Sequence, residues 1–213
     1  MTLHDYLQLS QSAQVYAVAD VSPLDPAPRL STRLGCDVRF KREDLQPVFS
    51  FKLRGAYNKL AGLDADARQQ GVITSSAGNH AQGVALAARS LGMRASIVMP
   101  VTTPSIKVEA VRRLGGQVTL HGDGYDDAYA HALALAAQQQ LTCVHPFDDT
   151  SVIAGQGTIG LELIEQLAAR PQAVFIPVGV GGLAAGIGAV LKQLSPDVRI
   201  IGVEPAEASA MAQ

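Results

Sequence analysis

The sequence predicts an α/β fold built around a mostly parallel β-sheet. Strand-like and helix-like segments alternate along the 213 residues with short turns between them, as in repeated βα units. Two uncharged runs, Ala95–Met99 and Val174–Val178, are typical of strands that are buried on both faces. Gly92 and Gly115 stand where two of the helices should end.

The periodicity assigns each element a place in the chain. Strands are predicted at 37–41, 71–75, 95–99, 116–120, 141–144, 173–178 and 198–203. Helices are predicted at 3–18, 51–63, 79–91, 105–114, 124–140, 155–169 and 183–194, with a further start near 206. Because ligands of parallel sheets bind beyond the carboxyl ends of the strands, the candidate loops are 74–83, 100–105 and 177–183. We expect the chemistry in the first and third of these loops.

The composition excludes several classes of protein. With 47% hydrophobic and 17% charged residues, it is that of a soluble globular protein. The net charge of −2 gives no electrostatic reason to expect nucleic acid or an anionic membrane as a partner. Cys36 and Cys143 form no CxxC motif, so we expect neither a zinc site nor a disulfide framework. We expect the protein to lie in the cytoplasm, a reducing compartment. His121, His131 and His145 have no metal-ligand spacing.

Two segments bear on targeting. The N-terminus has no basic region followed by an apolar core, so no signal peptide is expected. Ala173–Leu191 carries no charge, but it contains Pro177 and glycines at 179, 181, 182, 186 and 188. A strand, a tight turn and a small-residue helix explain this segment better than a membrane span does.

The run Lys41–Asn58 places one lysine where a surface lysine is not expected. Pro47 breaks the chain there, and Ser50 is a good N-cap for a helix that begins near Phe51. Lys52 therefore falls in the first turn of that helix. A cation is unfavourable at this position, because the positive end of the helix dipole lies there.

The surroundings of Lys52 in the sequence favour its uncharged form. The helix dipole and the neighbouring cations Lys41, Arg42 and Arg54 should all disfavour a further positive charge. A neutral lysine is a nucleophile that can form a Schiff base with an aldehyde cofactor. The alternative is an ordinary solvated lysine, which is the usual state of lysines in proteins.

Two further loops carry small residues at the start of a predicted helix. In Ser75–Gly83, backbone N–H groups could converge on a substrate carboxylate, and the Asn79 amide could bind a phenolic or carbonyl oxygen. The alternative is a capped turn with Asn79 as the cap and His80 exposed. In Val178–Gly186 the backbone could surround a phosphate, although the spacing matches neither a P-loop nor a GxGxxG motif. The alternative here is a tight turn.

A lysine, an amide nest and a glycine turn are the three parts that a pyridoxal phosphate enzyme requires. The run Lys41–Asn58, the loop Ser76–His80 and the turn 179–183 resemble the pyridoxal-phosphate-dependent threonine deaminases, most closely the biosynthetic type. These belong to the fold-type-II, tryptophan-synthase-β-like family, whose architecture is a two-domain arrangement of parallel sheets. The resemblance extends from Ser22 to Glu204.

The resemblance implies a role for each site residue. Lys52 would bind pyridoxal 5'-phosphate as a Schiff base and, once displaced by substrate, would abstract the Cα proton. Phe51 would pack against the cofactor ring, and Asn79 would hydrogen-bond the 3′ oxygen of that ring. The substrate carboxylate would be held by the amides of Ser76, Ala77, Gly78, Asn79 and His80. The phosphate would be held by the amides of Gly179, Val180, Gly181, Gly182 and Leu183.

The implied reaction is the elimination of water from L-threonine to give 2-oxobutanoate and ammonia, the first step of isoleucine biosynthesis. L-Serine is a second candidate substrate. The alternatives within the fold are a serine/threonine dehydratase and an amino-acid racemase. Racemisation needs a second acid or base on the opposite face of the ring, and the sequence does not identify one.

The resemblance also implies a domain organisation. A small α/β domain, 48–146, would be inserted into a larger cofactor domain formed by 1–47 and 147–213, with the cofactor in the cleft between them. The family's catalytic module continues beyond Gln213, so we expect an N-terminal portion, C-terminally truncated. The competing hypothesis is a non-catalytic remnant, or a half-module that needs a missing C-terminal part.

Two further expectations follow from the family. Its tetramers imply that a complete chain forms a homo-oligomer, and no nucleic acid or membrane partner is expected. Val180 stands where the family has a glycine. If that position requires a positive φ, a β-branched residue there costs on the order of 1–3 kcal/mol.

Overall fold

The structure is a computed structural model that describes residues 1–211. The helices are α1 Leu3–Gln11, α2 Pro28–Leu34, α3 Lys52–Ala61, α4 Ala65–Gln70, α5 Asn79–Ser90, α6 Ser105–Arg113, α7 Tyr125–Gln139, α8 Thr150–Gln166 and α9 Gly182–Leu194. The strands are β1 Leu24–Pro26, β2 Arg39–Lys41, β3 Val72–Ser75, β4 Ala95–Met99, β5 Gln117–Leu120, β6 Thr142–Cys143, β7 Ala173–Pro177 and β8 Arg199–Val203. Short 3-10 turns are η1 Val15–Ala17, η2 Glu43–Leu45 and η3 Ala206–Ala208.

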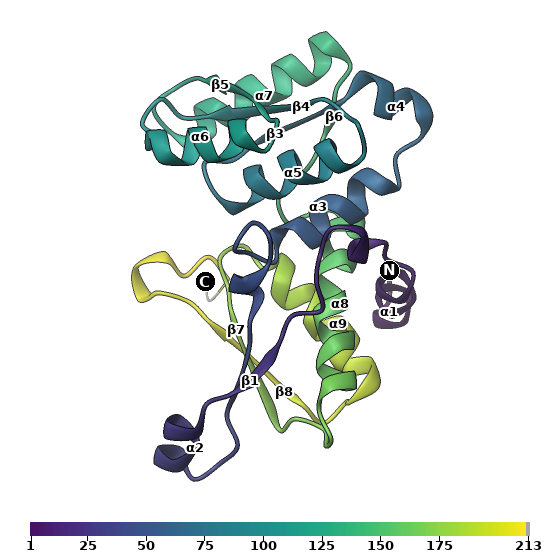
Figure 1. Cartoon of the computed structure of the whole chain (residues 1–213), viewed down its shortest axis with the longest axis vertical. Helices are drawn as coiled ribbons and strands as arrows, with labels where there is room; N and C mark the ends of the chain where they lie inside the picture. Colours follow the sequence, from purple (N-terminus) through teal and green to yellow (C-terminus); the bar gives the residue numbers. More distant parts are fainter. Residues whose placement is uncertain (212–213) are drawn as a thin grey trace.

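The largest sheet is parallel, in the order β5-β4-β3-β6. Successive side chains along each strand point to opposite faces of the sheet, and helices cover both faces (Figure 1). On one face α7 packs through a cluster made of Ile73, Val98, Ala128, Ala132 and Leu141. On the other face α3, α5 and α6 join a larger cluster that includes Val72, Val84, Ile97, Val108 and Val111. The prediction of βα units with parallel pairing is confirmed here.

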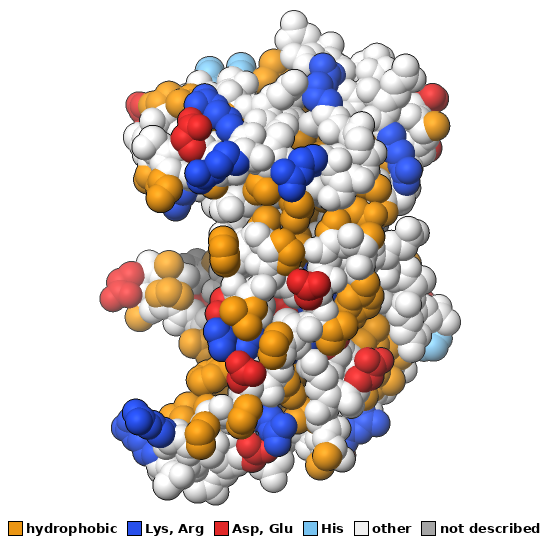
Figure 2. All heavy atoms as spheres, in the orientation of Figure 1, with side chains coloured by type: hydrophobic (Ala, Val, Ile, Leu, Met, Phe, Trp, Pro, Cys, Tyr) orange, Lys and Arg blue, Asp and Glu red, His pale blue; other side chains and the backbone are white. Residues whose placement is uncertain are grey.

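A second parallel pair, β7-β8, lies in the lower part of the molecule (Figure 1). Helices α8 and α9 cover one of its faces through Ile159, Leu163, Ile176, Ile187, Leu191 and Val198. On the other face Phe175 is 67% exposed, and Val203 is exposed as well. Hydrophobic side chains are correspondingly frequent on the surface of this lower part (Figure 2).

The strand predicted at 37–41 is shorter and pairs differently from the expectation. It spans Arg39–Lys41 and pairs antiparallel with β1, a strand that the sequence analysis missed. The strands of the described residues therefore form three separate sheets and not one. A three-residue strand carries too short a pattern to indicate its partner.

The helix predicted at 3–18 is wrong in its second half. It ends at Gln11, where the Ser12 hydroxyl donates back to the Gln8 and Leu9 carbonyls, and Val15 then enters the core in a 3-10 turn. Helices α2 and α4 were not predicted. The helix predicted at 155–169 begins earlier, at Thr150, because the Asp149 carboxylate accepts hydrogen bonds from the first amides of α8.

Helices α3 and α8 cross at two glycines. A Cβ atom placed on Gly155 would lie 2.7 Å from the Arg54 carbonyl oxygen and 2.7 Å from the Gly55 Cα atom. A Cβ atom on Gly55 would lie 2.7 Å from the Val152 carbonyl oxygen. The two backbones therefore approach as closely as glycine permits, which brings Arg54 within reach of the polar side chains of α8.

The two parallel sheets come from different stretches of the chain. The four-stranded sheet uses residues 72–143, whereas β7-β8 uses residues 173–203, and Figure 1 shows them in separate lobes. The space-filling view shows a notch between these lobes at the left (Figure 2). The division into 48–146 and the flanking stretches 1–47 and 147–213 stays a prediction, and residues 212–213 lie outside the described part.

Candidate functional site

Lys52 lies in the first turn of α3, as predicted, and is its first residue. The helix starts one residue later than expected, so its N-cap is Phe51 and not Ser50, although the Ser50 hydroxyl accepts a hydrogen bond from the Lys52 amide at 3.1 Å. The Lys52 Nζ donates to the Pro146 carbonyl oxygen at 2.8 Å. Burial lowers the pKa of the Lys52 amine below its ordinary value. Lys52 is therefore a partly buried amine that is easier to deprotonate than a surface lysine.

The predicted contribution of the neighbouring cations to this pKa is wrong. Lys41 pairs with Glu162, Arg42 pairs with two aspartates, and Arg54 pairs with Glu43 as well as Glu162. Their charges are thus compensated by carboxylates, and the lowered pKa of Lys52 has burial as its cause. Sequence reasoning placed the cations correctly along the chain, but it could not pair them.

The segment 144–147, directly after β6, connects the predicted parts of the site. The carbonyl oxygen of Val144 lies 3.1 Å from His80 Nε2, and the carbonyl oxygen of Pro146 accepts from Lys52. The start of α3 and the start of α5 are therefore both held by one short stretch of backbone. No motif had marked this stretch, because its backbone carbonyls leave no signature in the sequence.

The same segment reaches the glycine turn. A Cβ atom on Gly182 would lie 3.0 Å from Phe147 Cβ, so the turn packs directly against residue 147. Helix α5 also touches the start of α3, since a Cβ atom on Gly83 would lie 3.0 Å from the Lys52 carbonyl. The lysine, the loop before α5 and the glycine turn, far apart in the sequence, are thus neighbours in the fold.

The loop before α5 offers fewer free amides than predicted. The Ser76 amide donates to the Val98 carbonyl oxygen at 3.1 Å, and the Gly78 amide donates to the Ser76 hydroxyl at 3.2 Å. The amides of Ala77, Asn79 and His80 have no acceptor among the described residues. The predicted nest of five amides is therefore reduced to three in this structure.

His80 is buried, which contradicts the alternative in which it is exposed. Its Nε2 faces a carbonyl oxygen and so carries the proton, while its Nδ1 has no partner among the described residues. Burial lowers the pKa of His80 to about 3, so the ring is neutral at physiological pH. Asn79, the first residue of α5, is exposed, and the N-cap is Gly78.

The glycine turn has the geometry of an anion cradle. Gly181 caps α9 with φ +86°, a conformation that requires glycine. Val180 has no positive φ, so the strain considered for this position is absent. The five amides of residues 179–183 have no acceptor among residues 1–211, and they lie at the amino end of a thirteen-residue helix. These unpaired donors fit the phosphate of a cofactor.

Two other residues lie beside this turn and this lysine. Met211 Sδ would be 2.6 Å from a Cβ atom on Gly181, and the Met211 amide donates to the Glu204 carboxylate at 2.9 Å. Glu204 therefore holds the segment that lies against the turn. Phe51 is half-buried among the residues that pack on β7 and α9, with its ring centroid 5.4 Å from Lys52 Nζ.

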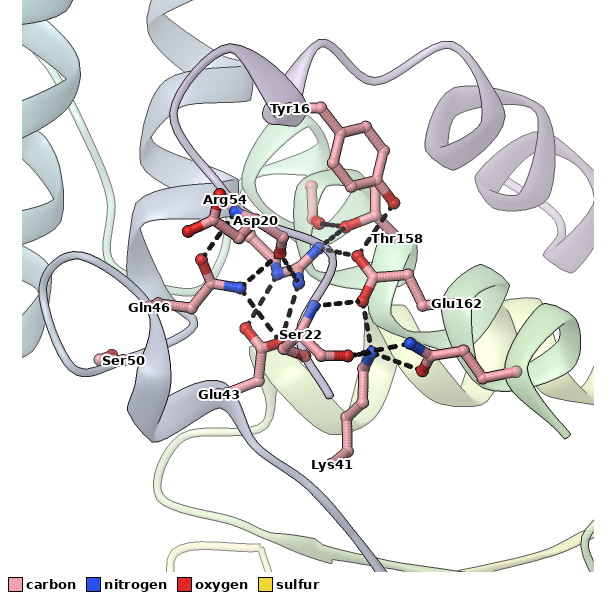
Figure 3. A network of polar contacts seen from close by, with 12 residues as sticks. Tyr16, Asp20, Ser22, Lys41, Glu43, Gln46, Ser50, Arg54, Thr158 and Glu162 are labelled. Atoms are coloured by element: carbon pink, nitrogen blue, oxygen red, sulfur yellow. Dashed lines mark hydrogen bonds and ion pairs between the residues drawn. The ribbon is translucent and has the colours of Figure 1, made fainter. Parts of the chain in front are cut away.

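A buried network of charged and polar side chains, which the sequence analysis did not predict, surrounds Arg54 of α3 (Figure 3). Arg54 Nη1 donates to Glu162 and, at 3.1 Å, to the Thr158 hydroxyl of α8. Its Nε and Nη2 donate to the Glu43 carboxylate at 2.9 and 2.8 Å. The network also includes Tyr16, Asp20, Ser22, Lys41, Gln46 and Gln166. A charged residue inside the apolar helix 155–169 was the one available signal.

Other kinds of site find no support in the described part of the chain. No group of three or more His, Cys, Asp and Glu side chains there could hold a metal ion. No helix there is long and apolar enough to cross a membrane. Two surface hollows lie around Arg170 and Pro171, and one of them extends to Ser195 and Arg199. They are at the amino ends of β7 and β8, whereas the glycine turn follows the carboxyl end of β7.

Comparison with known proteins agrees with this geometry. A family model described as pyridoxal-phosphate dependent enzyme matches residues 18–213. A biosynthetic threonine dehydratase from Arabidopsis thaliana is 59% identical over 98% of this chain and 35% of its own length. A biosynthetic L-threonine dehydratase from Burkholderia multivorans is 55% identical over 100% of this chain and 43% of its own length. The chain thus spans less than half the length of these curated relatives.

Solved structures share the same fold. A processed threonine deaminase isoform from Solanum lycopersicum superposes with a TM-score of 0.95 and 55% identity, over 98% of this chain and 57% of the other. A maize serine racemase superposes with a TM-score of 0.91 and 32% identity, over 96% of this chain and 62% of the other. With the family model matching nearly the whole chain, this protein belongs to the family of pyridoxal-phosphate-dependent enzymes.

Proposed function

We propose that this chain binds pyridoxal phosphate through Lys52 and forms the N-terminal, cofactor-binding part of a biosynthetic threonine dehydratase. The reaction is the removal of water from L-threonine to give 2-oxobutanoate and ammonia, at the start of isoleucine biosynthesis. The observation that carries the proposal is the partly buried Lys52 amine, with its lowered pKa, in the same neighbourhood as five unpaired amides at the amino end of α9. The identity to threonine dehydratases over the whole chain supports it.

The residues divide the work by their chemistry. Lys52 would hold the cofactor aldehyde, and its amine would take the proton from the Cα atom of the substrate. The amides of Gly179, Val180, Gly181, Gly182 and Leu183 would hold the phosphate, helped by the positive end of the α9 dipole. When bound, the cofactor supplies an electron sink for the pair left on Cα. Phe51 would pack against the cofactor ring, and the Asn79 amide would hydrogen-bond the ring oxygen.

The substrate carboxylate is held at the start of α5. Because the Ser76 and Gly78 amides already have acceptors, this role falls to the amides of Ala77, Asn79 and His80. The neutral His80 ring adds no charge of its own, so the attraction comes from amides and the helix dipole. An amino acid held by its carboxylate at the start of α5 would lie in the same neighbourhood as Lys52, because the segment 144–146 contacts both Lys52 and His80.

A visible absorbance titration with pyridoxal phosphate tests the proposal. The purified chain should develop a lysine-bound cofactor band that disappears in Lys52→Ala and changes on adding L-threonine. Lys59→Ala is the matched control, because Lys59 lies on the same helix but pairs with Asp149 on the surface side. A band of equal strength in Lys52→Ala and in the wild type would refute the role of Lys52.

Substrate choice and reaction type are tested by product analysis. Threonine dehydration yields 2-oxobutanoate, serine dehydration yields pyruvate, and racemisation yields the D-amino acid. The fold similarity to serine racemases makes racemisation the second candidate. We expect 2-oxobutanoate as the main product, and D-serine formation without a 2-oxo acid would favour the racemase.

We further propose that the chain acts in the cytoplasm and as part of a homo-oligomer. A half-module that pairs with a separate C-terminal part remains the alternative, and the coverage of 35–43% of the curated relatives supports considering it. Sedimentation of the chain alone tests self-association. A cofactor band that forms only after adding a C-terminal fragment of a relative would favour the half-module.

A further inference from the structure

An ion pair between Glu43 and Arg54 joins the two ends of the stretch of chain that contains Lys52. Two nitrogens of the Arg54 guanidinium donate to both oxygens of the Glu43 carboxylate, at 2.8 and 2.9 Å, which is a bidentate ion pair (Figure 3). The Arg54 side chain is fully buried, and the Glu43 side chain is 14% exposed. We call this pair the clasp and residues 44–53 the clasped loop.

The clasp is itself held rigidly from α8. Glu162 and Thr158 accept hydrogen bonds from the remaining Arg54 nitrogen, and the backbone of α3 packs directly on Gly155 of α8. The side chain of Gln46, inside the loop, bonds both the Asp20 backbone and, at 3.4 Å, the Glu43 carboxylate. Both ends and the middle of the clasped loop are therefore fixed by buried polar contacts.

The clasped loop contains a strained residue. Phe49 has φ +55°, a left-handed conformation that non-glycine residues rarely adopt, and its ring is 79% exposed. Since the exposed ring has little packing, the strain is not stabilised by the Phe49 side chain. A strained residue persists only where its surroundings determine its conformation, and here the clasp closes the loop around it.

The clasped loop contains Lys52 near its end, where the Lys52 amide donates to the Ser50 hydroxyl and the Lys52 amine donates to the Pro146 carbonyl oxygen. We propose that the clasp positions Lys52: it keeps the clasped loop closed, so that the partly buried amine stays hydrogen-bonded to the Pro146 carbonyl, where the cofactor would bind. Glu43 and Arg54 are then positioning residues. Buried ion pairs can often be replaced by apolar residues without loss of stability, so a geometric role accounts for this one better than stability does.

The proposal rests on Lys52 as the cofactor lysine, but its test needs no cofactor. The pH dependence of chemical labelling of each lysine amine, followed by mass spectrometry, measures the solvation of Lys52 in the cofactor-free chain. Glu43→Gln removes one charge of the clasp. Lys59→Met is the matched control, because it breaks the Lys59–Asp149 ion pair between the same helix and α8.

Opening the clasp should return Lys52 to water. We expect Glu43→Gln to raise its limiting labelling rate several-fold and to move its half-labelling pH upward, toward the ordinary lysine value of about 10.4. Lys59→Met should leave both unchanged. His80 of α5 interacts electrostatically with Lys52, but it is neutral at every pH at which Lys52 titrates. It therefore does not affect the labelling profile of Lys52. Equal profiles for wild type and Glu43→Gln would overturn the proposal, even if the cofactor band is normal.

A rescue experiment tests the link between strain and clasp. Glycine adopts a left-handed conformation freely, so Phe49→Gly should let the loop close without the ion pair. The double variant Glu43→Gln/Phe49→Gly is expected to label Lys52 more nearly like the wild type, and a profile equal to that of Glu43→Gln would contradict this. If Glu43→Gln does not fold, Glu43→Asp keeps the charge at a shorter reach and should give a smaller shift in the same direction. An unshifted Glu43→Asp would also overturn the proposal.

Discussion

The crossing of α3 and α8 makes Gly155 a position where one added methyl group should be harmful. Its Cβ atom would lie 2.7 Å from the Arg54 carbonyl oxygen, and the helices must move apart by about 0.7 Å to reach 3.4 Å, where ordinary contact begins. Overpacking of this kind costs about 1–3 kcal/mol. Looser Arg54 hydrogen bonds add about 1 kcal/mol, and the better helix propensity of alanine offsets about 1 kcal/mol.

Gly155→Ala should therefore lower the free energy of unfolding by about 1–3 kcal/mol. Gly188→Ala is the matched control, because Gly188 lies inside α9 with nothing within 4 Å of its Cβ position. It should raise stability by about 0.5–1 kcal/mol. Thermal unfolding followed by circular dichroism should separate the two variants by roughly 4–12 °C. Equal melting temperatures would refute the claim that backbone contact limits this crossing.

Two further predictions concern pH. His80 is neutral in the folded chain with a pKa of about 3, so its stabilisation is complete above the unfolded value near 6.5 and falls by about 1.4 kcal/mol per pH unit below it. Denaturant titrations of wild type and His80→Gln between pH 4 and 7 should show a steeper loss in the wild type, and parallel curves would contradict this. Burial raises the pKa of Glu162, but hydrogen bonds and charges from Arg54 and Lys41 outweigh it and leave that pKa below its ordinary value. The stability advantage of wild type over Glu162→Gln should thus be complete above about pH 4.3 and vanish as the pH falls through the lowered pKa, so an advantage that grows in acid would be inconsistent.

The elements of this fold differ in how well they could be predicted from the sequence. The lysine helix, the glycine turn and the parallel strands were predictable, because each depends on neighbours within a few residues. Lys52 falls in a first turn for local reasons, and Gly181 takes its left-handed conformation within its own turn. Short elements such as β1 and α2 were missed, since three to seven residues carry too little periodicity.

The amino-acid sequence by itself thus determined the α/β class, the parallel pairing and the loops proposed to bind the cofactor and substrate. Only the tertiary structure decided why the Lys52 amine is easier to deprotonate, which side chains neutralise the cations around it, and that the backbone of 144–147 joins α3, α5 and the glycine turn. The physical reason is the distance along the chain between the residues that interact. Hydrogen bonds such as Lys52 to Pro146 and Arg54 to Glu162 connect residues about a hundred positions apart, and burial exists only once the chain has packed.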